Sequence, residues 1–130
     1  MALINANPQA ELKPEFEAVQ VGKYRMRIKE VVDRNPEKND LKLTLEFVDP
    51  AMNINNLAGQ PCKAVGNLFD YVMLAADKQW KLRQLTEAAG LPWGNYDPVV
   101  ELPGKELEVQ VKLEAYEGEQ KNKVARYIVG

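Results

Sequence analysis

The chain has 130 residues, of which 45% are hydrophobic and 28% are charged, and its formal net charge is −2. These values are typical of one globular domain, and no apolar run approaches the ~20 residues that a membrane-spanning helix needs. A single cysteine and the absence of histidine exclude an internal disulfide, a Ser-His-Asp triad and histidine-ligated zinc.

The first 21 residues are expected to form an extended N-terminal arm, because they contain two prolines and show no sustained periodicity. They also lack the basic start and apolar centre of a signal peptide. Together with the single Cys62, this predicts a protein of the reducing cytoplasm without a membrane partner. The remaining residues, 22–130, are predicted to form one domain.

The segment Gly22–Asp33 alternates in the way expected of a β-strand. Its apolar side chains Tyr24, Met26, Ile28 and Val32 share one predicted face, and four cations occupy the other, namely Lys23, Arg25, Arg27 and Lys29. The polar turn 34–40 then leads into a second alternating strand, 41–48. The two strands are therefore expected to form a long antiparallel hairpin.

The second half of the chain contains a strand, a helix and two more strands. A thirteen-residue linker precedes the third predicted strand, 63–74, in which Gly66 indicates a bulge or bend. A helix is expected to begin at an Asp77 cap and to end at Gly90. Two further strands, 105–116 and 124–129, flank a turn at 117–123.

The resulting order, β-β-β-α-β-β, is typical of an OB-fold. A ferredoxin-like domain would need a helix directly after the first strand, and the turn at 34–40 is too short for one. The predicted fold is thus mainly β: a five-stranded OB-fold barrel with one helix and an extended N-terminal arm.

A predicted basic track would cover the surface on which OB-folds bind oligonucleotides. It combines the first-strand cations with those of the second strand and of two predicted loops: Lys23, Arg25, Arg27, Lys29, Arg34, Lys38, Lys42, Lys121 and Lys123. Like charges two residues apart repel, so four cations without an intervening acid suggest that an anion is expected there. The alternative is that the row is only the solvated face of an amphipathic strand.

Aromatic side chains supply the second element of a single-strand site, because bases stack on them. Phe69 and Tyr71 are the candidates on the third strand, although either ring could instead pack beneath the N-terminal arm. Phe47 and Trp80 lie on apolar faces and are predicted to belong to the core.

An acidic Mg²⁺ site is the one catalytic possibility that remains. Asp33, Asp40 and Lys42 weakly match the acid-acid-lysine arrangement of some nucleases, but hairpin loops attract aspartate for turn reasons alone. We therefore expect no catalytic residues, no metal site and no cofactor.

Several motifs resemble those of a phage-encoded family long catalogued as a domain of unknown function, over about Phe16 to the C-terminus. The matching pieces are Gly22-x-Tyr24, Phe69-Asp70, Trp80-Lys81-Leu82-Arg83, Ala89-Gly90-Leu91, Gly104-Lys105, Tyr116-x-Gly118 and Asn122-x-Val124-x-x-Tyr127. The chain departs from the family in having Gln20-Val21 where relatives tend to have a proline, so the arm is expected to enter differently. It also ends at Gly130 without an acidic tail, which puts partner recruitment by such a tail in doubt.

The resemblance implies a single-stranded DNA-binding protein of phage replication and recombination, located in the cytoplasm of the infected bacterial host. Its expected partners are single-stranded DNA and phage replication or recombination proteins, and homo-oligomers are compatible with this class. The alternative is a phage structural or protein-interaction module, and a Mg-dependent nuclease is the third reading.

Overall fold

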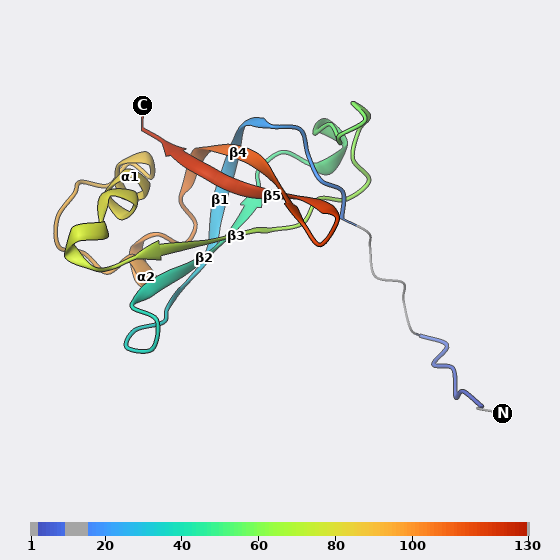
Figure 1. Cartoon of the computed structure of the whole chain (residues 1–130), viewed down its shortest axis with the longest axis horizontal. Coiled ribbons are helices and arrows are strands. Elements are labelled where there is room, and N and C mark those ends of the chain that lie inside the picture. The colour runs from blue at the N-terminus through green and yellow to red at the C-terminus, as the bar shows by residue number, and fades with distance from the viewer. Residues whose placement is uncertain (1–2, 10–15, 130) are drawn as a thin grey trace.

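One five-stranded antiparallel sheet dominates the computed structural model, which describes residues 3–9 and 16–129 (Figure 1). The strands are β1 Gly22–Asp33, β2 Asp40–Phe47, β3 Leu68–Met73, β4 Glu106–Tyr116 and β5 Glu119–Ile128. Their hydrogen-bonded order is β3-β2-β1-β4-β5, so β3 and β5 are the edge strands. Between β3 and β4 the chain forms helix α1, Trp80–Ala88, and the one-turn helix α2, Pro98–Glu101.

The predicted sequence of strands and principal helix is confirmed, and β1 has the predicted bounds. The third strand is shorter than expected, because residues 63–67 run outside the sheet. Gly66 therefore forms no bulge within β3. A Cβ atom at Gly66 would lie 3.2 Å from Cγ of Phe16, so the glycine leaves room for this ring.

A β-bulge interrupts β1 after Ile28. Ile28 pairs with Leu45, and Glu30 pairs with Thr44, so Lys29 is the extra residue. Before the bulge the even-numbered residues point into the core, and beyond it the odd-numbered Val31 does. Val31 is accordingly 5% exposed and Val32 is 40% exposed. The prediction that Val32 lies on the apolar face was therefore wrong, because strict alternation takes no account of an extra residue.

The core lies against the inner face of the sheet. Alternate residues of the three central strands are buried there, including Met26, Ile28, Leu43, Leu45, Val109 and Val111. Helix α1 adds Leu82 and Leu85, which are three residues apart and share one side of the helix. Burial of these side chains supplies the main driving force for folding.

Side chains bridge the gap between the two edge strands. In Figure 1, β5 runs beside β3 and α1 lies at one end of them, and both strands contact α1. Tyr127 donates from its backbone N to Gln84 Oε1 of the helix (2.9 Å) and from Oη to Asp70 Oδ2 of β3 (2.6 Å). Among the described strands, no ladder of backbone hydrogen bonds joins β3 to β5, so the sheet is not a closed barrel.

Helix α1 ends as its sequence predicts and begins differently. Gly90 has φ +81°, and the N–H groups of Gly90 and Leu91 donate to the Glu87 and Thr86 carbonyls, which is a Schellman ending. Asp77 is not the cap, because it lies in a 3-10 turn, Ala76–Lys78, ahead of the helix.

Trp80, at the start of α1, is 68% exposed, so its predicted place in the core was wrong. The buried side of the helix runs through Leu82, Leu85 and Thr86 instead. A tryptophan two residues before Leu82 points away from that side, because consecutive helical positions are 100° apart.

The end of the N-terminal segment is fixed against the sheet. Val19 is buried, and its N–H and carbonyl group bond the side-chain amide of Asn122 at 2.8 and 3.0 Å. The rest of the predicted arm falls partly on residues 1–2 and 10–15, which lie outside the described residues. In the described part of the chain, no helix is long and apolar enough to cross a membrane.

Candidate nucleic-acid interface

The outer face of β3 presents aromatic rings to solvent. Leu68 and Val72 point into the core, so the intervening side chains Phe69 and Tyr71 point outward and are 46% and 44% exposed. Both rings are therefore available for stacking, which agrees with their predicted position. Residues 10–15 of the arm lie outside the described residues, and with the described residues in place neither ring is buried.

Each ring has a cation from the β1–β2 hairpin above it. Lys42 Nζ lies 5.0 Å from the centroid of the Phe69 ring, and Arg34 Cζ lies 4.5 Å from that of Tyr71. The pairing of β2 with β3 sets Lys42 opposite Tyr71 and two pairs away from Phe69, which pairs with Thr44. Cation and ring thus alternate along this edge of the sheet, and exposed pairs of this kind contribute about 0.5–1 kcal/mol each.

A groove opens beside Phe69, with a volume of about 780 Å³. Its walls are the starts of β3 and β5 together with residues 16–18 of the N-terminal segment. Four predicted binding residues from three different strands line it: Lys29, Phe69, Lys121 and Lys123. Distant parts of the sequence thus place three lysines around one exposed ring.

The sequence predicted that Lys121 and Lys123 lie in a loop, but in the structure both lie on β5. The turn consists of Glu117 and Gly118 alone, with φ values of +49° and +80°. Two consecutive residues of positive φ form the tight hairpin turn that matches the twist of antiparallel strands. The segment 119–123 therefore pairs with β4 instead of forming part of the turn.

The cations in the middle of β1 are neutralised by acids of the neighbouring strands. Arg25 Nε lies 3.1 Å from Glu106 Oε1, and Arg27 donates to Glu46 at 3.2 Å and to Glu106 at 3.3 Å. Hydrogen bonds from Arg25 and then Arg27 hold the pKa of Glu106 below its ordinary value. The premise that this row lacks acidic neighbours was wrong.

The β1–β2 loop carries Arg34 and Lys38. The Arg34 guanidinium donates to both carboxylate oxygens of Asp40 at 2.6 Å, and this hydrogen bonding lowers the pKa of Asp40. Lys38 is exposed, as is Lys23 at the start of β1. Neither takes part in an ion pair with another described residue.

The acids considered for a nuclease site have structural partners. Asp40 binds Arg34, and Asp33 Oδ1 accepts a hydrogen bond from the Asn35 N–H in the turn. Within residues 3–9 and 16–129, no group of three Asp, Glu or Cys side chains is arranged to hold a metal ion.

Some residues of the groove were not identified from the sequence. Phe16, Asn67 and Asn122 line it, and Glu17 adds a negative charge at its wall. Glu17 is held by the Lys63 N–H (2.6 Å) and the Asn56 side chain (3.0 Å), and the Lys63 bond is the larger cause of its lowered pKa. No periodic signal marks these residues, because tertiary contacts of the linker and the N-terminal segment bring them together.

The comparisons with known proteins identify a family. A model of DUF669, a protein family of unknown function, matches residues 6–128. The chain therefore belongs to this family. No significant match was found among curated proteins.

Proposed function

We propose that the chain is a sequence-independent single-stranded DNA-binding protein that performs no chemistry. The observation that carries the proposal is the row of exposed rings on β3, each beneath a cation, next to a groove lined by Lys29, Lys121 and Lys123. Single-stranded DNA needs such a combination, because its phosphates bind cations and its bases stack on aromatic side chains.

We further propose that the sheet is an open form of the OB-fold. An OB-fold binds oligonucleotides over strands two and three, flanked by the loops that join strands one to two and four to five. In this chain the order β3-β2-β1-β4-β5, with α1 following β3, agrees with that topology. The exposed rings then lie on strand three, with Arg34 and Lys38 toward one end and Lys121 and Lys123 toward the other.

The groove favours a single strand over a duplex. A base in a duplex is stacked on its neighbours and offers its faces to no protein ring, whereas an unpaired base offers both faces. Stacking on Phe69 or Tyr71 discriminates little between bases, since every base has a π-face. Binding is therefore expected to be independent of sequence.

The biological setting follows from the resemblance to phage proteins. We place the protein in the cytoplasm of an infected bacterial host, where it would coat DNA during phage replication and recombination. Phage proteins of the same modules, and further copies of the chain, are its proposed partners.

A phage structural or protein-interaction module is the second candidate function. The observation that favours it is Trp80, a large apolar side chain that remains 68% exposed at the start of α1. Tryptophan is enriched in the interfaces between proteins relative to the rest of the surface.

A gel-shift titration with an oligothymidine strand, with and without Mg²⁺, separates the candidate functions. Binding without cleavage in both conditions is the expected result. No shift would favour the interaction module, and cleavage that depends on Mg²⁺ would favour the nuclease. A duplex of equal length is the control, and we expect it to bind more weakly than the single strand.

A further inference from the structure

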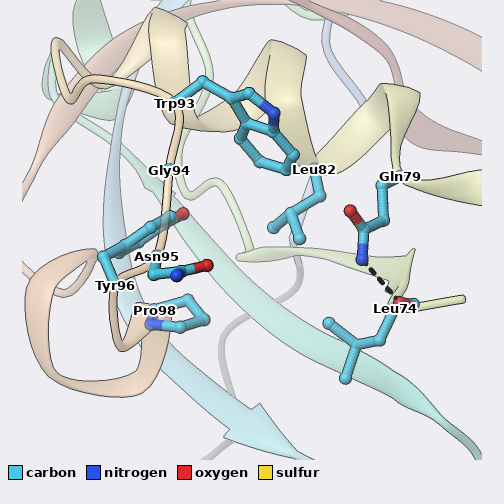
Figure 2. A pocket seen from close by; sticks show the side chains of 8 residues that line it. All are labelled: Leu74, Gln79, Leu82, Trp93, Gly94, Asn95, Tyr96 and Pro98. Carbon is cyan, nitrogen blue, oxygen red and sulfur yellow. Dashed lines mark hydrogen bonds between the residues drawn. The ribbon is translucent and has the colours of Figure 1, made fainter. Parts of the chain in front are cut away.

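A second cavity, separate from the groove, lies between helix α1 and the loop that follows it (Figure 2). It has a volume of about 410 Å³ and is lined by Leu74, Gln79, Leu82, Trp93, Gly94, Asn95, Tyr96 and Pro98. This volume is within the range of ~300–1,000 Å³ found for pockets that bind small molecules. None of the lining residues carries a charge.

Two of the walls are held in place by hydrogen bonds. The Tyr96 hydroxyl lies 2.6 Å from Thr86 Oγ1, and Thr86 is fully buried and donates to the Leu82 carbonyl. On the opposite side, Gln79 Nε2 donates to the Leu74 carbonyl at 2.9 Å. The Tyr96 ring and the Gln79 amide are thereby positioned before any ligand arrives, which lowers the entropic cost of binding.

Three neutral polar groups at this cavity have no hydrogen-bond partner among the described residues: Gln79 Oε1, the Asn95 amide and Trp93 Nε1. In Figure 2 the Gln79 oxygen and the Asn95 amide point into the space between them, and the Trp93 ring lies across one side. The cavity thus combines aromatic rings with uncharged donors and acceptors.

The ligand suited to these walls is flat, uncharged and able to form hydrogen bonds along its edge. An aliphatic side chain would leave the amide groups desolvated without partners, at a cost in free energy. A phosphate would find no cation among the lining residues. A nucleobase meets each condition, because it has two π-faces and an edge of donors and acceptors.

We propose that this cavity receives one unpaired base of the bound strand, an inference that rests on the proposed binding of single-stranded DNA. Leu74, which lines the cavity, directly follows β3 and donates from its N–H to the Asn39 carbonyl of the β1–β2 loop. Leu74 follows Tyr71 by three positions, so their Cα atoms are at most ~11 Å apart. A strand stacked on Tyr71 therefore passes close to the cavity.

Tryptophan fluorescence tests the proposal, because the chain has two tryptophans and Trp80 lies elsewhere. In the Trp80→Phe variant, Trp93 is the one remaining tryptophan. A fluorescein-labelled oligothymidine reports binding by anisotropy, and Trp93 emission reports the cavity. We expect the anisotropy to rise and the Trp93 emission to fall with the same midpoint of the titration. A rise in anisotropy with unchanged emission would overturn the cavity proposal and leave DNA binding intact. No rise in anisotropy would overturn both.

A pair of asparagine variants tests the contact itself. Asn95→Ala removes an amide that has no hydrogen-bond partner among the described residues, and Asn53→Ala is the matched control at an exposed position of the linker. Loss of one hydrogen bond should weaken oligothymidine binding by about 2- to 12-fold. An oligomer of the same length without bases should bind both variants equally. Equal affinity of the two variants for oligothymidine would overturn the proposal. So would a loss of affinity of Asn95→Ala for the abasic oligomer as large as its loss for oligothymidine.

Discussion

Tyr127 of β5 and Asp70 of β3 are joined by a 2.6 Å hydrogen bond from the phenolic Oη to Oδ2. Tyr127 is 1% exposed, and the other oxygen of Asp70 accepts a 2.8 Å hydrogen bond from Lys81 Nζ of helix α1. The edge strands of the sheet are therefore held together by side chains at the point where a barrel would close by backbone pairing.

The Tyr127→Phe variant should be less stable than the wild type by about 1.5–3 kcal/mol, the usual value of a hydrogen bond to a charged group. Phenylalanine preserves the packing of the ring but leaves Asp70 Oδ2 without its donor. Urea denaturation measures the difference in the free energy of unfolding. Tyr116→Phe is the control, because Tyr116 is 59% exposed and a surface change of this kind stays within ~0.5 kcal/mol. Equal effects of the two variants would contradict the structural role of the Tyr127 hydroxyl.

Alkaline pH should weaken the fold through the same residue. Burial, and then the charge of Asp70, raises the pKa of Tyr127 well above its usual value. The unfolded chain loses the phenolic proton near pH 10 and binds fewer protons than the native state above that pH. The free energy of unfolding should therefore fall by up to ~1.4 kcal/mol per pH unit above pH 10. Tyr127→Phe should lose less stability over this range, and parallel curves for the two proteins would refute the assignment.

Trp80→Ala should leave the free energy of unfolding within ~0.5 kcal/mol of the wild type, because the ring is 68% exposed. A buried ring would instead cost ~3–5 kcal/mol. Leu85→Ala, at a fully buried position of the same helix, is the comparison and should cost ~2–5 kcal/mol. Chemical denaturation of both variants decides whether Trp80 lies on the surface.

Removal of the β3 rings should weaken DNA binding without unfolding the protein. Phe69→Leu and Tyr71→Leu keep an apolar side chain at half-exposed positions but abolish stacking. Each is expected to cost about 1–3 kcal/mol of binding free energy, or roughly 5- to 150-fold in affinity. Trp80→Leu removes an exposed ring on another surface and serves as the control. If all three variants bind oligothymidine equally well, β3 is not the stacking surface.

The sequence was informative where a local pattern decides the structure. Strict alternation placed β1 correctly at Gly22–Asp33, and Gly90 marked the end of α1, because only a residue tolerant of positive φ completes that ending. The outward position of Phe69 and Tyr71 also followed from alternation once the strand was found.

The errors arose where another part of the chain decides the outcome. Glu46 and Glu106 neutralise Arg25 and Arg27 from neighbouring strands, and no property of the β1 sequence alone reveals these partners. The extra residue Lys29 reversed the faces of β1, so Val32 lies outside. That same bulge residue lines the groove with Lys121 and Lys123, a grouping set by the tertiary fold.

The salt dependence of oligothymidine binding tests the proposed phosphate contacts most directly. If Lys29, Lys42, Lys121 and Lys123 each neutralise one phosphate, log K should fall with log salt at a slope of about −3, because each contact contributes ~0.7. The double variant Lys121→Ala with Lys123→Ala should bind more weakly at low salt and show a slope shallower by about 1.4. Arg83→Ala with Arg126→Ala removes the same charge outside the groove and should keep the wild-type slope. A wild-type slope near zero, or equal slopes in the two double variants, would contradict binding of DNA in this groove.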